Sequence, residues 1–589
     1  MPLAATPPRP PVSQIRTRRD LFLPLAAPAP AAAGVYSPAT AMRKPPAFAE
    51  APMTPPALPP IGVVALNRAG FGPRPGEVDA FNALGANDTA RLTAWVDQQL
   101  NPGAIDDTDC NNRIAAAGYA TLNKTSQQLF QDHYLADPPD WEVHIQPALE
   151  SELATWTRAV YSKRQLFEAM VHFWHNHFNV YAYEFIEGPM WIQYDRDVIR
   201  ANALGNFRTL VEKVTKSPSM LVYLDNFLNF SEDGTGYSNE NFARELIELH
   251  TIGAVNSFGN TPRNQIPLDG QGRPIGYCED DVKDMARALT GWTFDIDWIW
   301  QQPGTTGDFV YRDDLHNDLE AKIVLGVNIA AGGTAAADGG AALDAIVNHP
   351  ACAQFVAKKL CRRLVADFPS QSLVDGAAAV FTANLAAPDQ IAKVVRYILL
   401  SNDFKNTWGE KIKRPFEIAV SALRAGNASW NFHYTIPYPA DWDQWGADMQ
   451  DTSTLHWIFE AGNQEIFGWH PPNGHPDVRG AWQSASPRVA LWRTSNWLID
   501  IEYNTTAWRL DALAQTPANV RSANQLTDFW IQRIFNRALP DADRSEIVQF
   551  MAQGHNPDLA LPLDTDEDTQ DRLRSMVGLL FMSPEFLWR

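Results

Sequence analysis

Apolar residues recur every three or four positions along most of the chain after residue 60, which is the spacing of one face of an α-helix. Alternating runs typical of strands are few, and Pro, Gly, Asn and Asp mark the segments between the helical patterns. The pattern predicts a mainly α fold, built as one large multi-helix assembly. We expect residues 61–330 to form a helical domain that carries the candidate site, and residues 331–589 to form a helical scaffold domain.

Two stretches of the second half resemble each other weakly. The first comprises Ile346 to Val365 and Val394 to Phe404, and the second comprises Leu526 to Leu539 and Met576 to Arg589. Each contains a helix with an arginine near its end and a last helix that closes on a Ser-x-x-Phe turn. We interpret the two as a duplicated helical unit, which argues that this half is scaffold.

Residues 1–60 lack the helical pattern and are rich in Pro and Ala. Arg18 and Arg19 are followed by Asp20 and a short apolar run that ends in small residues at Ala33. This order resembles a twin-arginine export signal over residues 1–33, followed by a Pro/Ala-rich linker over 34–60. The alternative is an arginine-containing disordered tail. A signal would place the protein in the periplasm or outside the cell.

The charge balance excludes one class of partner. The 589-residue chain has 48 Lys and Arg against 68 Asp and Glu, a net charge of −20, so its surface repels phosphate backbones and no nucleic acid partner is expected. No long apolar run predicts a transmembrane span. The four cysteines lack CxxC spacing, which argues against a thiolate zinc site and against covalent haem. The 20 tryptophans could stack on sugar rings or fill the core.

The segment from Lys163 to Val180 predicts a helix with two different faces. The apolar face, which also holds His177, comprises Leu166, Phe167, Met170, Phe173 and Trp174. Glu168, His172 and His175 lie opposite, at a spacing of i, i+4, i+7 that suits three ligands of a divalent metal and suits a water-facing stripe equally well. A histidine within an apolar face needs a hydrogen-bond partner, a carboxylate or a ligand.

A second helix is predicted over residues 239–253. Glu240, Arg244 and Glu248 are spaced for i, i+4 ion pairs, which stabilise an exposed helix without any further role. Glu245 lies on the same charged side, whereas His250 lies in the middle of the apolar face. The preceding loop is rich in Asp and Asn, which form turns and could also bind a hard cation.

The start of a third helix completes the candidate site. Three carboxylates from Glu279 to Asp281 would favour the helix dipole, but Asp281 also borders the apolar stripe. We therefore predict a site where the three helices meet. Its general acid and base would be Glu240, Glu245 and Asp281, and a metal that activates water would be held by His175, His177 and His250. The cofactor is unknown, although a divalent metal fits these residue types.

Several motifs carry a family resemblance. They are LNRAGFGPRPGEVDA (66–80), FWHNHFNV (173–180), NENFARELIELHTIG (239–253) and GWHPPNGHPDVRGAW (468–482). Together they resemble the bacterial family called domain of unknown function 1800, across nearly the whole chain after residue 60. The resemblance implies an exported protein with a partner of the domain of unknown function 1501 type, a family similar to alkaline phosphatases and sulfatases. It implies no activity.

Three functions follow from these patterns. The first is an exported hydrolase, metal-assisted or using carboxylates as acid and base, for which a carbohydrate is the first substrate class to test. The second is a non-enzymatic helical scaffold or maturation partner of an exported alkaline phosphatase-like protein. The third and weaker one is a redox protein in which His177 or His250 binds a cofactor.

Overall fold

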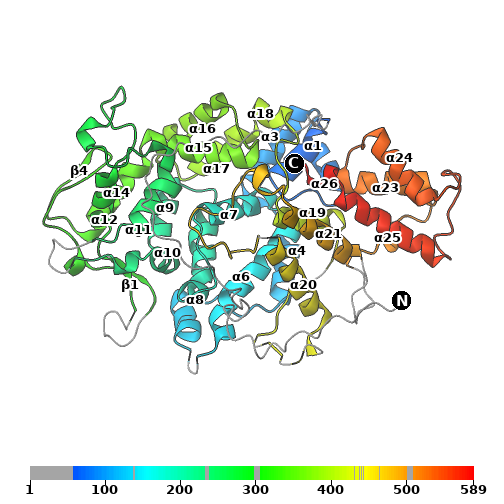
Figure 1. Ribbon diagram of the computed structural model, residues 1–589, viewed down its shortest axis with the longest axis horizontal. Helices are drawn as coiled ribbons and strands as arrows, with labels where there is room; N and C mark the ends of the chain where they lie inside the picture. Colours follow the sequence, from blue (N-terminus) through cyan, green and yellow to red (C-terminus); the bar gives the residue numbers. More distant parts are fainter. Residues whose placement is uncertain are drawn as a thin grey trace, which may run out of the picture.

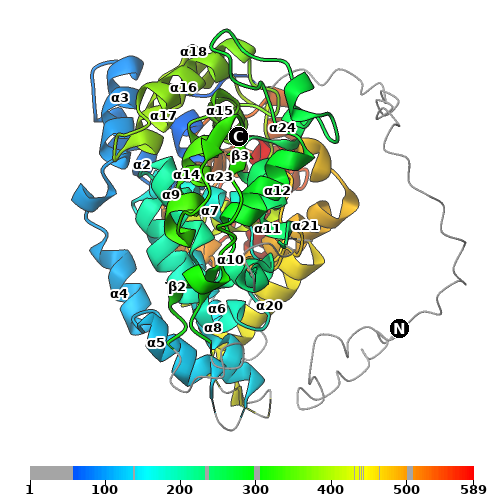
Figure 2. The same ribbon diagram turned by 90° about the vertical axis from the view of Figure 1, so that its left-hand side faces the viewer.

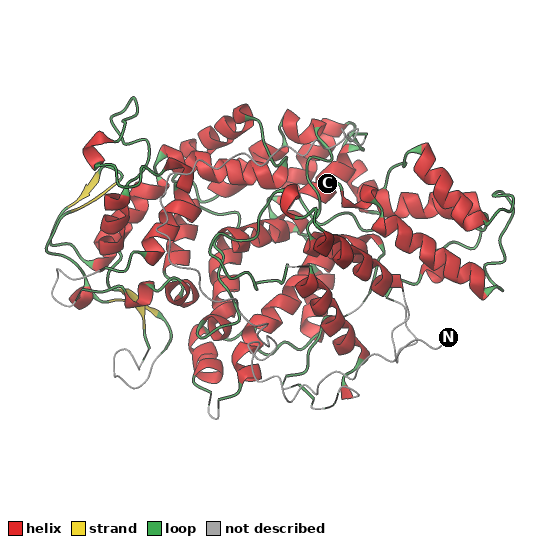
Figure 3. Cartoon of the chain, viewed as in Figure 1, coloured by secondary structure: helices red, strands yellow, loops and turns green. Residues whose placement is uncertain are grey.

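The computed structural model describes residues 57–589 except 137–138, 232–237, 297–305, 430, 437, 440, 442–443, 463 and 500–508. It is mainly helical (Figure 3), which confirms the predicted fold class. The predicted signal over 1–33 and most of the linker lie outside the described residues. None of the helices within the described part is both long and apolar enough to cross a membrane.

The first half of the chain contributes α7, which carries part of the candidate site, and the helices before and after it. They are α1 (Ile61–Arg68), α2 (Glu77–Asn82), α3 (Asp88–Gln99), α4 (Thr108–Ala116), α5 (Ser126–Leu129), α6 (Trp141–Tyr161), α7 (Gln165–His177), α8 (Glu187–Ile192), α9 (Phe207–Thr215), α10 (Pro218–Tyr223), α11 (Asn241–Glu245) and α12 (Glu279–Ala288). Side chains at the N-caps fix several of these starts; Asn87, Asp140 and Asn206 each accept a hydrogen bond from a backbone N–H of the first turn.

The second half adds α14 (Ala335–Val347), α15 (Pro350–Leu364), α16 (Gln371–Ala383), α17 (Gln390–Leu399), α18 (Asn402–Asn406), α19 (Pro415–Ala425), α20 (Ala447–Ala461), α21 (Ala485–Ile499), α22 (Ala512–Gln515), α23 (Ala523–Phe535), α24 (Asp541–Ala552), α25 (Glu567–Met582) and α26 (Pro584–Leu587). The strands form two antiparallel pairs, β1 (Trp292–Phe294) with β2 (Phe309–Tyr311) and β3 (Lys322–Val324) with β4 (Val327–Ile329). Trp292 lies opposite Tyr311, and Lys322 lies opposite Ile329.

Helix α7 lies near the middle of the molecule in both views, with α12 and α14 toward one end and α23 to α25 at the other (Figures 1 and 2). One large buried cluster joins α1, α3, α7, α9, α12 and α14 to α17, and it therefore contains residues on both sides of position 330. A second cluster joins α6, α19, α21 and α23 to α25. The predicted domain boundary at residue 330 stays a prediction.

The end of the chain packs against segments far away in the sequence. Ile412 and Trp588 form an isolated antiparallel bridge, and the N–H of Lys413 donates to the carbonyl oxygen of Leu587 at 2.9 Å. The C-terminal residues therefore pack against Ile412 and Lys413, in the segment that immediately precedes helix α19 (Figure 1). This return path delivers the Arg589 side chain to the interior, where it is 1% exposed.

Arg424 of α19 fastens the N-terminal part to the second half. Its fully buried guanidinium donates to the carbonyl oxygens of Gly72 at 2.6 Å and Val160 at 2.7 Å, and to the carboxylate of Glu77 at 2.7 Å. One side chain thus satisfies acceptors from three segments. Buried acceptors that lose such a donor carry their full desolvation cost.

Replacing Arg424 by Met tests this fastening. We expect Arg424→Met to lower the free energy of unfolding by about 3–5 kcal/mol, because the ion pair of a buried guanidinium with the partly exposed Glu77 and two carbonyl partners are lost together. Arg521→Met is the matched control, since Arg521 pairs with the exposed Asp564 and should contribute less than about 1 kcal/mol. Urea unfolding followed by circular dichroism measures both. Equal losses in the two variants would contradict the assignment.

Candidate functional site

Helix α7 presents two buried faces. Its predicted apolar face is buried as expected and includes Leu166, Met170, Phe173 and Trp174. The opposite face was expected to meet water or a metal, but Glu168 is 6% exposed and His175 is 7% exposed, so it is not a water-facing stripe. Buried polar side chains need partners inside the protein.

Those partners come from the π-helical segment Gln193–Arg200. The Nε2 atom of His175 lies 2.8 Å from Oδ1 of Asp195, and Arg200 lies 2.9 Å from both Asp195 and Glu168. Burial alone would raise the pKa of Asp195, but Arg200 and the hydrogen bond from His175 hold that pKa well below its usual range. His175 therefore belongs to a buried ion network.

The two histidines of the apolar faces meet. The ring centroids of His177 and His250 are 5.8 Å apart, and Nε2 of His177 lies 2.9 Å from the carbonyl oxygen of His250. His250 lies in the π-helical segment Leu246–Thr251, which directly continues α11. Burial, with the charge of Lys359 adding to it, lowers the pKa of His177 well below its usual value and lowers the pKa of His250 to about 3. Both rings are therefore neutral at pH 7.

Two of the predicted catalytic carboxylates lie in a surface charge cluster. Arg244 pairs with Glu240 at 3.0 Å, Glu248 at 3.6 Å and Glu279 at 2.8 Å, so the predicted helix ladder is observed and extends to α12. Glu245 is partly buried, and its pKa is raised by burial and by the charge of Glu248. Neither Glu240 nor Glu245 lines the cavity beside the histidines described below.

The third predicted carboxylate, Asp281, is 1% exposed and is occupied by structural contacts. It accepts hydrogen bonds from the backbone N–H groups of Cys278 at 2.9 Å and Leu325 at 3.0 Å, and it lies 3.4 Å from Arg263. Asp281 thus caps the start of α12 and fixes the turn between β3 and β4. These contacts explain why a carboxylate lies beside an apolar stripe.

The three predicted metal ligands do not converge. His175 turns to Asp195, whereas His177 and His250 face each other. Throughout the part of the chain that the structure describes, no group of three or more His, Cys, Asp or Glu side chains is arranged to hold a metal ion. The meeting of His177 and His250 therefore needs an explanation other than a shared metal.

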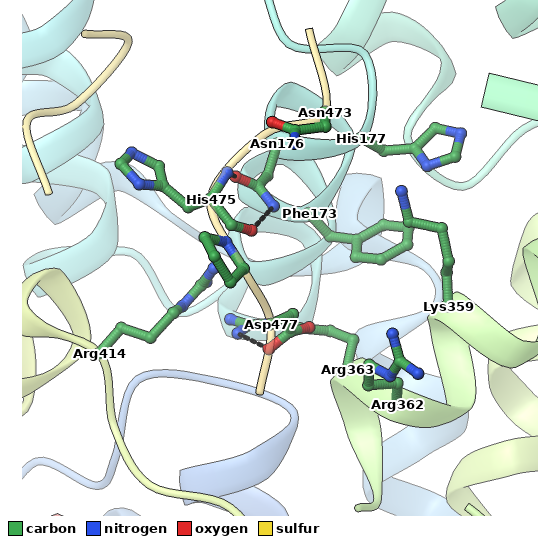
Figure 4. Close-up of a pocket in the computed structure, with 11 residues that line it drawn as sticks. Phe173, Asn176, His177, Lys359, Arg362, Arg363, Arg414, Asn473, His475 and Asp477 are labelled. Atoms are coloured by element: carbon green, nitrogen blue, oxygen red, sulfur yellow. Dashed lines mark hydrogen bonds and ion pairs between the residues drawn. The ribbon is translucent and has the colours of Figure 1, made fainter. Parts of the chain in front are cut away.

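A cavity of about 170 Å³ opens beside His177, and most of its charged lining is cationic. We call it the cationic pocket; its charged residues are Lys359, Arg362, Arg363, Arg414 and Asp477. Lys359, Arg362 and Arg363 share one face of α15, because positions i, i+3 and i+4 lie on the same side of a helix. Lys359 and Arg362 lie on one side of the pocket and Arg414 on the other, with Asp477 between them (Figure 4).

The segment 468–482 crosses α7 and closes the pocket. Nδ2 of Asn176 donates to the carbonyl oxygen of His475 at 2.9 Å, and the N–H of His475 donates back to Oδ1 of Asn176 at 2.7 Å. Nδ2 of Asn179 donates to the carbonyl oxygens of Trp469 and Pro471. The two asparagines of the FWHNHFNV motif thus hold the GWHPPNGHPDVRGAW motif in place.

Several pocket cations share one carboxylate. Oε1 of Glu417 lies 2.5 Å from Arg363, 3.2 Å from Arg414 and 2.8 Å from Arg589. Burial would raise the pKa of Glu417, but the three arginines hold it well below its usual range. Asp477 lies 3.9 Å from Arg363. The three arginines, taken together with Glu417 and Asp477, therefore carry a net positive charge.

Two further cations, Lys359 and Arg362, have no carboxylate partner in the described part of the chain, although Arg362 donates to the backbone carbonyl oxygen of Asp367 at 3.1 Å. Within the described ranges, no carboxylate oxygen lies within 4.0 Å of Lys359 or Arg362. Burial lowers the pKa of Lys359 to about 8, with Arg362 adding to this and Asp477 opposing it. Burial and the charge of Arg414 likewise lower the pKa of His475 to about 3. The pocket is a region of positive potential inside an acidic protein.

A smaller cavity of about 30 Å³ lies on the other side of Asn176 and His475. Five buried nitrogen atoms with no hydrogen-bond partner among the described residues belong to residues that line it: Nε2 of His172, Nδ1 of His175, Nε1 of Trp191, Nε2 of Gln464 and Nδ1 of His475. One water needs about 10–15 Å³ and two to four polar partners, so this cavity is suited to a single water molecule. It is too small for a substrate.

Sequence reasoning missed the charged residues of the cationic pocket. The available signal was the sequence KKLCRR within a helix predicted to be scaffold, which places Lys359, Arg362 and Arg363 on one face. Arg414 and Asp477 gave no comparable signal, because folding alone brings them to that face. Helix α7, on which part of the predicted site lies, also lines the cationic pocket, whereas none of the three predicted carboxylates lines it.

Gly474 lies where the crossing segment touches α7, at φ +68°, and a Cβ atom there would lie 2.0 Å from the carbonyl oxygen of Asn176. Gly474→Ala should therefore displace the segment and lower the free energy of unfolding by about 1–3 kcal/mol. Gly480→Ala is the control, because nothing lies within 4 Å of its Cβ, and it should stay within about 0.5 kcal/mol of the unmodified protein. Thermal unfolding compares them, and equal effects would contradict the described contact.

The neutral His250 predicts a pH dependence. Because its folded pKa is about 3 and its unfolded pKa is about 6.5, the unfolded chain takes up a proton first as the pH falls. Stability should decrease from pH 6.5 toward pH 3, with His250 contributing up to about 1.4 kcal/mol per pH unit. His250→Leu should remove this contribution. The free energy of unfolding, measured in urea at pH 4.5 and at pH 7, should then differ less between the two pH values than it does in the unmodified protein. An unchanged pH dependence would show that His250 is not buried as a neutral ring.

Comparison with known proteins gives one match. The chain matches the family described as "Protein of unknown function (DUF1800)" over residues 64–588. No curated protein and no solved structure matches it. The match covers all the motifs on which the resemblance rested and both sides of the cationic pocket. The chain therefore belongs to the DUF1800 family.

Proposed function

We propose that this protein binds a small anion, or the acidic group of a larger ligand, in the cationic pocket. The observation that carries the proposal is that Lys359 and Arg362 line the pocket without a carboxylate partner among the described residues, beside arginines that already share Glu417. Removing a charge from water is costly unless an opposite charge approaches it. A bound anion supplies that charge.

The chemistry of the pocket favours an oxyanion. Guanidinium groups present planar pairs of donors that match carboxylate, sulfate and phosphate oxygens. The Arg363 and Arg414 side chains are fixed by Glu417, so little rotational freedom is lost when a ligand binds. The volume of about 170 Å³ exceeds the space that one water needs and is suited to an acidic group with a few attached atoms.

The positive potential of the pocket also restricts the class of substrate in the hydrolase hypothesis. If the protein is a hydrolase, a substrate with a carboxylate, sulfate or phosphate fits the pocket better than a neutral carbohydrate. Catalysis by Glu240, Glu245 or Asp281 lacks geometric support, because none of the three lines the pocket. The scaffold and redox alternatives, the duplicated C-terminal unit, the export signal and the partner of the 1501 type stay predictions.

Isothermal titration calorimetry with inorganic phosphate at low ionic strength tests the proposal directly. We expect saturable binding that Arg362→Gln weakens by about tenfold, equivalent to 1.4 kcal/mol, because one of the pocket's guanidinium groups is removed. Lys358→Gln is the matched control: it removes the same charge from an exposed position on the same helix and should leave the affinity unchanged.

Two results would contradict anion binding. One is the absence of saturable binding of phosphate, sulfate and acetate to the folded protein. The other is an equal loss of affinity in Arg362→Gln and Lys358→Gln, which would indicate a general surface effect. Circular dichroism of each variant establishes that the fold is retained.

A further inference from the structure

We propose that Lys359 is a nucleophilic amine that forms an imine with a carbonyl ligand whose acidic group is held by the pocket arginines. This inference rests on the proposed anion binding and adds a reacting group to it. The ligand class is an oxo acid or another carbonyl compound that carries a carboxylate or phosphate.

The position of Lys359 carries the inference. Its side chain lines the cationic pocket (Figure 4), and Nζ lies 5.4 Å from the centroid of the Phe355 ring. No carboxylate of the described chain lies within ion-pairing distance of Nζ. The preceding residue, Lys358, is exposed, because a step of about 100° around the helix turns it away from the pocket. Lys359 is thus an amine that the fold directs into a cavity without pairing it.

The surroundings favour the neutral form that reacts. Only an unprotonated amine can attack a carbonyl carbon, and burial beside another cation is the arrangement that activates lysines in this way. Burial lowers the pKa of Lys359 to about 8; the charge of Asp477 opposes this, and the charge of Arg362, the neighbouring cation, adds to it. The buried Lys411, which also contacts the pocket residue Asp477, is paired instead, at 2.8 Å from Asp367 and 3.2 Å from Asp477.

The arginines give the ligand its orientation. Arg363 and Arg414 are anchored on Glu417, whereas Arg362 projects from the same helix face as Lys359. An acidic group bound by these guanidinium groups would place the rest of a short ligand within the same small cavity. A carbonyl carbon next to that group then meets Lys359 without a long diffusional search.

The step balances without an oxidant or reductant. The nitrogen lone pair of Lys359 forms a bond to the carbonyl carbon, and the carbonyl oxygen becomes a hydroxyl group. The carbon–oxygen bond then breaks as the carbon–nitrogen double bond forms. The two amine protons leave with the former carbonyl oxygen as water, so the products are an imine and one water molecule.

Reductive trapping tests the proposal on the full-length protein. Glyoxylate, an aldehyde with a carboxylate, is added at pH 8 with sodium cyanoborohydride, and peptide mass spectrometry locates the reduced adduct. We expect Lys359 to be modified at least about tenfold faster than Lys358, because a carboxylate held by the pocket arginines brings the carbonyl carbon next to Lys359, whereas Lys358 is exposed. Inorganic phosphate should suppress the modification of Lys359, and the neutral aldehyde acetaldehyde should show less preference for it.

The inference is overturned if glyoxylate modifies Lys358 and Lys359 at equal rates, or if phosphate gives no protection. Calorimetry separates this failure from failure of anion binding. Phosphate that binds without any preferred adduct at Lys359 removes the imine but keeps the proposed function. Absence of phosphate binding removes both. Lys359→Arg keeps the charge, and it should retain phosphate binding within about threefold while losing the adduct.

Discussion

The Glu417 carboxylate and the three arginines around it hold the centre of this protein together. Arg363 comes from α15, Arg414 precedes α19, and Arg589 lies at the end of the described chain, so one carboxylate joins three separate segments. Breaking a buried ion cluster by removing one partner costs several kcal/mol, because the remaining charges stay buried. The path of the last residues, the position of α15 and the shape of the cationic pocket all depend on this arrangement.

The same cluster creates the property that we assign to the pocket. One carboxylate cannot neutralise three guanidinium groups, and Lys359 and Arg362 add charge without adding a carboxylate partner. The neutral state of His177 and His250 follows from this field as well as from burial, since the charge of Lys359 lowers both pKa values. Of the two contacting rings, His177 lines the pocket, and His250 packs against His177 without lining it.

Helix patterns allowed much of the fold to be predicted, and the limits of prediction were physical. The helix over 163–180, its apolar face and the burial of His177 and His250 follow from residue spacing. The hydrogen bond that Asp281 accepts from the N–H of Leu325 could not be predicted from local spacing, because Leu325 lies in a distant turn. The segment around His250 is π-helical, which changes the number of residues per turn. A helical-wheel projection at 100° per residue therefore misplaces the directions of the side chains in this segment. The Glu417 cluster joins residues far apart in the sequence, which no local pattern predicts.

An anomalous scattering experiment tests the central claim most directly. Crystals of the protein are soaked in selenate, whose oxygen geometry matches that of sulfate and whose selenium atom is located from anomalous differences. The account predicts a selenium peak inside the cationic pocket, with selenate oxygens in contact with Arg362 and with Arg363 or Arg414. Peaks confined to surface lysines and arginines, with the pocket empty of selenium, would contradict it.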